Sequence, residues 1–336
     1  MNPIQQIIRL GFPWETRDPF LFCVHHQDFY PAGNEKLGPV ESLAGRNIGN
    51  DFDPRQKWRM YHGDTVPGFP AHPHCGFETV TVVTRGLIDH SDSLGAAGRF
   101  GNGDVQWMTA GKGVQHCEMF PLLNREGDNP LELFQLWLNL PKSKKSAEPY
   151  FSMLWSDTIP IVHAKDQNGK TTQIKIVAGD LQDNKAPAPA PDSWAANPSH
   201  EVAIWIIHME PYAEWTLPSS RQEVNRMLYH YKGSTLRVHT QEIQRGHGVE
   251  LKSKEAVTLV NGPDETRLLL LQGKPIGEPV THYGPFVMNS QHEIQDVIRE
   301  YQRTQFGGWP WPSHDHTHPR ERGRFARYTD GHEEIK

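Results

Sequence analysis

Two clusters of metal-ligand residues constrain this chain more than any other feature of its sequence. The string HPHCGFETVT begins at His72, and GKGVQHCEM begins at Gly111. If each cluster lies on a β-strand, its two potential ligands project from one face, because side chains alternate along a strand. These ligands are His72 and His74 in the first cluster, and His116 and Glu118 in the second. Three imidazoles and one carboxylate suit a divalent transition metal, and they are too rich in nitrogen for magnesium or calcium.

The residues between the two clusters predict a barrel. ETVTVVTRG, from Glu78 to Gly86, is rich in Thr and Val and ends at a glycine, as a strand that runs into a turn would. Residues 87–92 predict the returning strand, and glycines mark further turns between residues 95 and 113. No helical period occurs here. Short strands separated by glycine turns are typical of an all-β sandwich or barrel.

Composition limits the classes of function. The 336 residues suggest about two domains. A formal net charge of -6 argues against direct binding to nucleic acid, which usually requires a basic stripe. The longest apolar run, residues 202–207, is too short to cross a membrane, and the first residues lack the features of a secretory signal. Three cysteines do not form a disulfide framework, so we expect a cytoplasmic protein with no membrane partner.

The second half of the chain predicts another barrel. Short strand-like segments follow an Ala/Pro-rich loop at residues 183–198, near which we place a domain boundary. The histidines of this half lack an i, i+2 partner of another ligand type, so we expect no metal here; they are His208, His230, His239 and His247. The expected domains are a barrel with the metal site over residues 11–180, a second barrel over 199–289, and a helix with a polar tail over 290–336.

The last part of the chain predicts one helix. Ser290 is followed three residues later by Glu293, a capping box, and apolar residues then recur at helical spacing until Gly307. Residues 309–336 are rich in Pro, Arg and His, and they predict a solvated tail or a clamp. Three alternating histidines in this segment could bind a metal adventitiously; they are His314, His316 and His318.

Longer strings resemble the pirin family of bicupins. H-x-H, a Glu four residues later and a closing glycine resemble the first motif of the cupin superfamily, whereas the second motif lacks its usual proline. HPHCGFETVT, DVQWMTAG, FQLWLNLP and GPFVMN together resemble pirin over roughly residues 11–307. The resemblance implies an all-β bicupin with a short C-terminal helix. It also implies a metal, usually iron, held by His72, His74, His116 and Glu118.

Strand parity does not decide which glutamate supplies the carboxylate ligand. Glu78 has the same parity as His72 and His74, and many cupins have a ligand at its place. The resemblance to pirins favours Glu118 as the carboxylate ligand. Glu78 is then an alternative ligand, or a residue that orients the ligand imidazoles.

Two cysteines lie beside the expected ligands. Cys75 and Cys117 each follow a ligand histidine directly, so we expect both to point away from the metal as small buried residues. A redox-responsive thiol pair is the alternative if their strands are neighbours. Pirins commonly have Arg at the place of Cys75, which puts in doubt any partner contacts made by that surface.

Two functions follow from the resemblance. Several pirins oxidise quercetin with dioxygen and release carbon monoxide, which predicts a quercetin 2,3-dioxygenase that acts on a flavonol. Fe(II) is the expected metal, although Mn, Ni, Cu and Co also suit this ligand set, and Glu118 is the expected proton acceptor. An aromatic group either shapes a pocket for a planar ligand or is simply core; it comprises Phe69, Phe77, Trp107 and Phe120. The alternative is a non-enzymatic, iron-binding and redox-responsive protein that acts on a protein partner as a transcriptional co-regulator.

Overall fold

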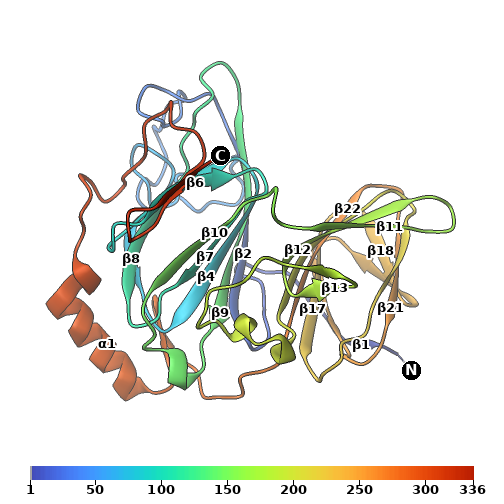
Figure 1. Ribbon diagram of the computed structural model, residues 1–336. Coiled ribbons are helices and arrows are strands. Elements are labelled where there is room, and N and C mark those ends of the chain that lie inside the picture. The colour runs from blue at the N-terminus through green and yellow to red at the C-terminus, as the bar shows by residue number, and fades with distance from the viewer. Residues whose placement is uncertain (1) are drawn as a thin grey trace. The chain divides into compact units, whose positions relative to one another are not determined.

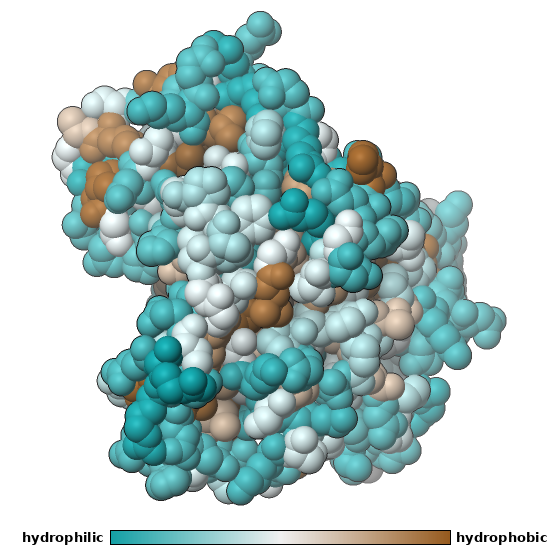
Figure 2. Space-filling model, turned by 60° about the vertical axis from the view of Figure 1, so that its left-hand side comes forward, coloured by the Kyte–Doolittle hydropathy of each residue, from teal (hydrophilic) through white to brown (hydrophobic). Residues whose placement is uncertain are grey.

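The computed structural model describes residues 2–336, and within them the chain forms short antiparallel strands and a single α-helix (Figure 1). The prediction of an all-β fold with a short C-terminal helix is therefore confirmed. Figure 2 shows a face that is mainly hydrophilic, with apolar residues in small separate patches. In the described part of the chain, no helix is long and apolar enough to span a membrane.

The chain folds into two compact units, and each is assembled from two segments. We call Val24–Ser156 with Glu278–Lys336 the first barrel, and Asp157–Gly277 with the residues up to Cys23 the second barrel. These limits differ from the predicted ones at two places. Residues 157–180 belong to the second barrel, because their strands pair within its large sheet. The Ala/Pro-rich loop at 183–198 lies inside the second barrel and is not a boundary.

The first barrel consists of two antiparallel sheets. In Figure 1 the five-stranded sheet runs in the order β10-β7-β4-β9-β2. Its strands are β2 (Phe20–Tyr30), β4 (Phe77–Arg85), β7 (Val105–Thr109), β9 (Asn129–Asn139) and β10 (Tyr150–Leu154). The six-stranded sheet, in the order β26-β25-β6-β5-β8-β3, comprises β3 (Gly68–His74), β5 (Leu87–Asp92), β6 (Ala97–Gly101), β8 (Val114–Met119), β25 (Phe325–Arg327) and β26 (Glu333–Ile335). Val83, Ile88 and Phe100 from the two sheets meet in one buried cluster, which closes part of the barrel.

Residues 309–336 are a clamp on the first barrel and not a solvated tail. β25 pairs with β6 and with β26, which extends the six-stranded sheet. The fully buried guanidinium of Arg99 donates to both carboxylate oxygens of Asp89, at 2.6 and 2.8 Å. It also donates to the carbonyls of His318, Pro319 and Arg322. A buried ion pair and backbone hydrogen bonds thus anchor a segment that has few apolar side chains to bury.

The predicted helix is confirmed as α1 (Gln291–Thr304). The Ser290 hydroxyl accepts a hydrogen bond from the backbone N–H of Glu293, and Ile294 and Val297 are buried. These apolar residues pack with Phe286 of β24 (Phe286–Met288), which pairs with β23 (Thr281–Tyr283). Short 3-10 helices flank this region at η1 (Lys142–Lys144) and η4 (Gln305–Gly307).

The second barrel also has two main sheets. Its seven-stranded sheet runs in the order β1-β20-β17-β22-β15-β12-β11, with strands β1 (Ile4–Arg9), β11 (Ile161–Lys165), β12 (Thr171–Ala178), β15 (Ala203–Met209), β17 (Asn225–Lys232), β20 (His247–Leu251) and β22 (Thr266–Gly273). The four-stranded sheet contains β16 (Glu214–Leu217), β18 (Thr235–Val238), β19 (Gln241–Gln244) and β21 (Val257–Asn261). A hairpin of β13 (Asp180–Leu181) and β14 (Asn184–Lys185) and the 3-10 turns η2 (Trp194–Ala196) and η3 (Pro198–His200) lie outside both sheets.

The interior of the second barrel is mostly apolar. Inward-facing residues of four strands, Ile174, Ile207, Leu228 and Leu268, are all at most 1% exposed and belong to one cluster. Along each of these strands, apolar residues that face inward alternate with residues that face outward. This pattern favours a strand, because one face of it is buried and apolar.

Candidate metal centre

The centre of the first barrel holds three histidines from two neighbouring strands. In the antiparallel register of β3 and β8, His72 lies directly opposite His116. The Nε2 atoms of these two rings are 3.1 Å apart. The His74 ring centroid lies 4.8 Å from that of His72 and 4.9 Å from that of His116. One ligand atom from each ring therefore falls within 4.8 Å of the others, and the residues 2–336 contain no other such cluster.

Burial keeps these imidazoles neutral. Desolvation lowers the pKa of His72 to about 4 and places the pKa values of His74 and His116 well below the ordinary 6.5. The Nδ1–H of His72 donates to the carbonyl of Pro70 at 2.8 Å, which fixes the tautomer and leaves the Nε2 lone pair facing His116. A histidine held in this way by a backbone carbonyl is oriented to bind a metal.

Glu118 lies on the same face of β8 as His116. Its Oε2 is 3.9 Å from His116 Nε2. Thr81 Oγ1 donates to Glu118 Oε1 at 2.9 Å, and Gln135 Nε2 donates to Oε2 at 2.7 Å. Burial raises the pKa of Glu118, and the two donors oppose that shift. The carboxylate is thus buried and oriented beside His116, although it lies outside the cluster formed by the three imidazoles.

Glu78 does not share a strand with His72 and His74. β3 ends at His74, Gly76 turns the chain with φ of 87°, and β4 begins in the other sheet. A side chain at Gly76 would clash, since its Cβ would lie 2.0 Å from the carbonyl oxygen of Val287. The parity argument for Glu78 is therefore wrong. Its carboxylate is fully buried and accepts a hydrogen bond from Thr109 Oγ1 at 2.8 Å, and its role as an alternative or orienting residue stays a prediction.

Several residues around the centre were missed by the sequence analysis. His90 on β5 lies opposite Glu118 in the strand register, and its ring centroid is 5.4 Å from that of His116. Its Nε2 is 3.3 Å from Asp92 Oδ2. The i, i+2 spacing of His90 and Asp92 was a visible signal. The contributions of Thr81 and Gln135 were not visible, because they depend on which strands pair.

Two half-buried aromatic rings flank the centre. The Phe69 ring lies 6.3 Å from the His72 ring, and the Trp137 ring lies 5.4 Å from the His74 ring. Both side chains are partly exposed, whereas Phe77 and Trp107 are fully buried core residues. Of the predicted aromatic group, Phe77 and Trp107 are therefore core residues, whereas Phe69 remains a candidate to contact a planar ligand. Trp137, which was not predicted, is a second candidate.

The two cysteines beside the ligands are buried free thiols. Cys75 Sγ donates to the carbonyl of Gly111 at 3.3 Å, and Cys117 Sγ donates to that of His316 at 3.6 Å. They belong to separate apolar clusters, although Cys75 directly follows β3 and Cys117 lies on its neighbour β8. Burial raises the pKa of Cys75 to about 12 and also raises that of Cys117. These surroundings favour the small buried residues that we expected, because reactive thiols need a lowered pKa.

The three alternating histidines near the C-terminus have other contacts. The His316 ring stacks on Trp311 with centroids 4.9 Å apart, and His318 Nε2 lies 3.0 Å from the carbonyl oxygen of His90. The carbonyl of His314 accepts the backbone N–H of Ala71, at 2.8 Å. Through His314 and His318, the C-terminal segment thus contacts β3, which carries two candidate ligands, and β5.

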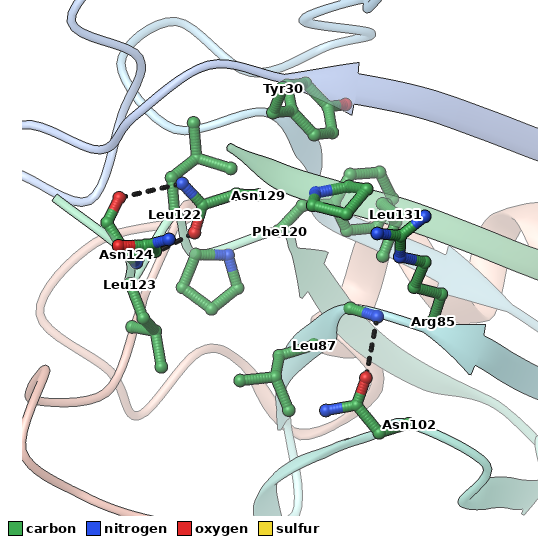
Figure 3. Close-up of a pocket in the computed structure, with 13 residues that line it drawn as sticks. Tyr30, Arg85, Leu87, Asn102, Phe120, Leu122, Leu123, Asn124, Asn129 and Leu131 are labelled. Carbon is green, nitrogen blue, oxygen red and sulfur yellow. Dashed lines mark hydrogen bonds between the residues drawn. The ribbon is translucent and has the colours of Figure 1, made fainter. Parts of the chain in front are cut away.

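Figure 3 shows a separate pocket of about 260 Å³ where β4 ends. Its lining is mainly apolar and includes Tyr30, Phe120, Leu122 and Leu131. Asn102 closes one side, since its Oδ1 accepts a hydrogen bond from the backbone N–H of Gly86 at 3.0 Å. None of the three histidines lines this pocket, so it is distinct from the candidate metal centre.

Two barrels with a histidine cluster inside one of them define a bicupin. The pirin family model matches residues 47–138, and the model of the pirin C-terminal cupin domain matches residues 204–307. Over 250 residues the chain is 36% identical to a Vibrio cholerae protein named "Putative quercetin 2,3-dioxygenase", with 72% of this chain and 81% of the relative covered. The chain belongs to the pirin family.

Two further comparisons support the assignment to this family. Pirin-1 of Arabidopsis thaliana is 36% identical over 242 residues, which cover 71% of this chain and 78% of that protein. A crystal structure of quercetin 2,3-dioxygenase from Acinetobacter baumannii matches with a TM-score of 0.71 and 25% identity. That match covers 92% of this chain and 99% of the crystal structure's chain, so the fold is shared across both barrels.

Proposed function

We propose that this protein is a metal-dependent quercetin 2,3-dioxygenase, which uses dioxygen to open the heterocycle of a flavonol. The observation that carries the proposal is the convergence of the three imidazoles within 4.8 Å, beside a buried carboxylate. His72, His74, His116 and Glu118 are the proposed ligands. The names of the Vibrio and Acinetobacter relatives support the reaction.

The spacing of the donors fits a transition metal. Bonds of about 2.1 Å from a metal to imidazole nitrogens place two adjacent ligands about 3 Å apart. The Nε2 atoms of His72 and His116 are separated by 3.1 Å. Fe(II) in this set would supply Lewis-acid and redox chemistry toward dioxygen. Mn, Ni, Cu and Co suit the same donors.

The chain's own residues bind and deprotonate the substrate. Phe69 and Trp137 flank the centre and orient a planar ring system between them. Glu118 accepts the proton of the flavonol 3-hydroxyl, because burial raises its pKa and makes the carboxylate more basic. Thr81 and Gln135 hold that carboxylate in place through their hydrogen bonds.

Turnover of quercetin by anaerobically Fe(II)-reconstituted protein tests the proposal. We expect the flavonol absorbance to fall only after oxygen is admitted, with release of carbon monoxide. The His74→Ala variant should lack this activity, whereas His230→Ala, which removes a buried histidine of the second barrel, should retain it. Stoichiometric iron binding without loss of quercetin would refute the flavonol assignment and favour an iron-dependent binding protein.

A further inference from the structure

The second barrel contains a buried arginine that lacks an acidic partner. Arg226 on β17 is 1% exposed. Its Nη2 donates to the carbonyl of Pro218 at 2.8 Å, and its Nη1 donates to that of Ser253 at 3.4 Å. Its Nε has no hydrogen-bond partner, and no ion pair of this guanidinium occurs in the described residues. The guanidinium is thus bound by two neutral carbonyls, whereas a buried cation normally pairs with a carboxylate.

Arg226 lies at one end of a mostly apolar interior. The strand register places it opposite Gln272, which in turn lies opposite Ala203. Trp205, two residues further on β15, faces the same side as Ala203, and its buried Nε1 also lacks a hydrogen-bond partner. Two unpaired N–H donors of the barrel interior thus come from one sheet, on strands β17 and β15, which lie on either side of β22.

These residues line a pocket of about 260 Å³. Arg226, Trp205 and Gln272 come from the sheet, and surface loops supply the rest of the lining; these loops contain Gly179–Gln182, Glu201–Val202 and Pro218–Arg221. A second pocket adjoins it and shares Asp180, Glu201 and Arg221 with it. This arrangement makes Arg226 part of a cavity wall at the end of the barrel.

The acids near Arg226 form no ion pair with it, although the nearby charge of Glu201 partly opposes the effect of burial on its pKa. Burial lowers its pKa to about 10, so the guanidinium stays protonated at neutral pH. Glu201 is occupied by another arginine, since its carboxylate accepts from Arg221 Nε and from the Arg221 backbone N–H, each at 3.0 Å. Asp180 also pairs with Arg221 at 3.0 Å. A buried unpaired charge costs several kcal/mol, which an incoming anion would offset.

The lining also contains strained backbone. Gln182 and Glu201 adopt left-handed conformations, with φ of 54° and 46°, although neither is glycine. Both positions belong to local turns, since Gln182 lies in the β13–β14 hairpin and Glu201 caps η3, so these conformations alone do not indicate a ligand. The pocket therefore combines two unpaired buried N–H donors, one of which belongs to the cation Arg226.

We propose that the second barrel binds a small organic carboxylate in this pocket, with Arg226 as its counter-charge. Arginine pairs with carboxylates through parallel hydrogen bonds, which favours this class of ligand. The pocket volume of about 260 Å³ is below the roughly 300–1,000 Å³ of pockets that take drug-sized ligands, which limits the ligand to about the size of succinate or benzoate. The proposal concerns the second barrel alone and does not depend on the metal centre or on its reaction.

The test uses the full-length protein with succinate and benzoate as probes, at constant ionic strength. Binding is followed through the indole N–H resonance of Trp205 and through the melting temperature. We expect a saturable shift of that resonance and a rise in melting temperature, because a ligand that binds only the folded state stabilises it. Inorganic phosphate and chloride serve as comparison anions and should have much weaker effects.

Two variants separate the site from general charge effects. Arg226→Met keeps much of the aliphatic stem and should weaken binding at least about tenfold, the loss expected for a charge-assisted contact. Lys232→Met removes an exposed charge from the end of the same strand and should bind as the parent protein does. If Arg226→Met does not fold, Arg226→Lys replaces it and should bind more weakly, since lysine lacks the planar fork.

Three results would overturn the proposal. They are the absence of saturable binding by either probe, equal binding of phosphate and the carboxylates, and an affinity that is unchanged in the Arg226 variant. The last two would identify a general anion effect at the protein surface.

Discussion

The two barrels share one fold but have interiors of opposite chemistry. The first barrel holds three neutral imidazoles, the carboxylate of Glu118 and the buried pair of Arg99 and Asp89. The second barrel is filled mainly by aliphatic side chains, with His230 among them and with Arg226 and Gln272 at one end. Since the same architecture accepts both interiors, the fold does not determine the chemistry. The function of each barrel has to be argued from the polar groups that it buries.

The two barrels also differ in the hydrogen-bond partners of their buried polar groups. In the first barrel, Glu118 has two donors, His72 has a carbonyl acceptor and Arg99 has a bidentate carboxylate partner. In the second barrel, the Nε of Arg226 has no partner at all. Buried polar groups without partners are costly, and both barrels contain some, since the Nδ1 atoms of His74 and His116 in the first barrel also have none. The barrels therefore differ in the charge of the unpaired group, which is a cation only in the second barrel.

The largest expected effect contrasts His116 with His230, two fully buried histidines from different barrels. His116→Ala should lower metal affinity more than about 100-fold, since even residues that only orient ligands contribute 10- to 100-fold. His230→Ala should leave the metal content unchanged. Metal analysis after dialysis and calorimetric titration measure both. Equal loss of metal in the two variants would remove the functional distinction between the barrels.

The next prediction contrasts the two buried arginines. Arg99→Met should destabilise the first barrel by about 3–5 kcal/mol, because it leaves the carboxylate of Asp89 buried without its partner. Arg226→Met should leave the second barrel as stable as before or more stable in the absence of ligand, since it removes a buried charge and strands no acidic partner. Denaturant unfolding gives the free energies, and hydrogen exchange assigns each change to a barrel. A large loss for Arg226→Met alone would mean that its contacts to Pro218 and Ser253 are the stabilising ones.

Acid should affect the metal-free first barrel more than the second. His72, His74 and His116 all have folded pKa values below 6.5, that of His72 at about 4, so the unfolded chain binds more protons across this window. Stability is therefore full above pH 6.5 and falls as the pH drops toward 4. His72 alone contributes on the order of 3 kcal/mol. In the second barrel, burial also lowers the pKa of His230.

Barrel-resolved hydrogen exchange between pH 7 and 4 measures this difference. A metal that binds the three imidazoles should shift the loss of stability to lower pH, because protons then compete with the metal. Equal acid sensitivity of the two barrels without metal would contradict the proposed role of the buried imidazoles.

The sequence predicted the features that depend on local spacing. The side chains of His72 and His74 face the same site because they are two residues apart on one strand, and the helix at residues 291–304 follows from its cap and its apolar period. Features that depend on distant pairing were missed. Gly76 places Glu78 in another sheet, although the residues are close in sequence. The C-terminal clamp relies on Arg99, whose partners His318 to Arg322 lie more than two hundred residues away.

The smallest expected effect contrasts two glutamines that face the barrel interiors, Gln135 and Gln272. Gln135→Leu removes the donor that holds Glu118 Oε2 at 2.7 Å, which should weaken metal binding about tenfold and raise the pKa of the carboxylate further. Gln272→Leu removes a hydrogen bond to the carbonyl of Glu201 and should not change metal affinity. Titration with Fe(II) or Mn(II) compares the variants at one pH. If Gln135→Leu weakens metal binding tenfold in the Thr81→Val variant as well as in the parent protein, the two donors orient Glu118 independently. Wild-type affinity in both glutamine variants would show that Glu118 either needs no orientation or is not a ligand.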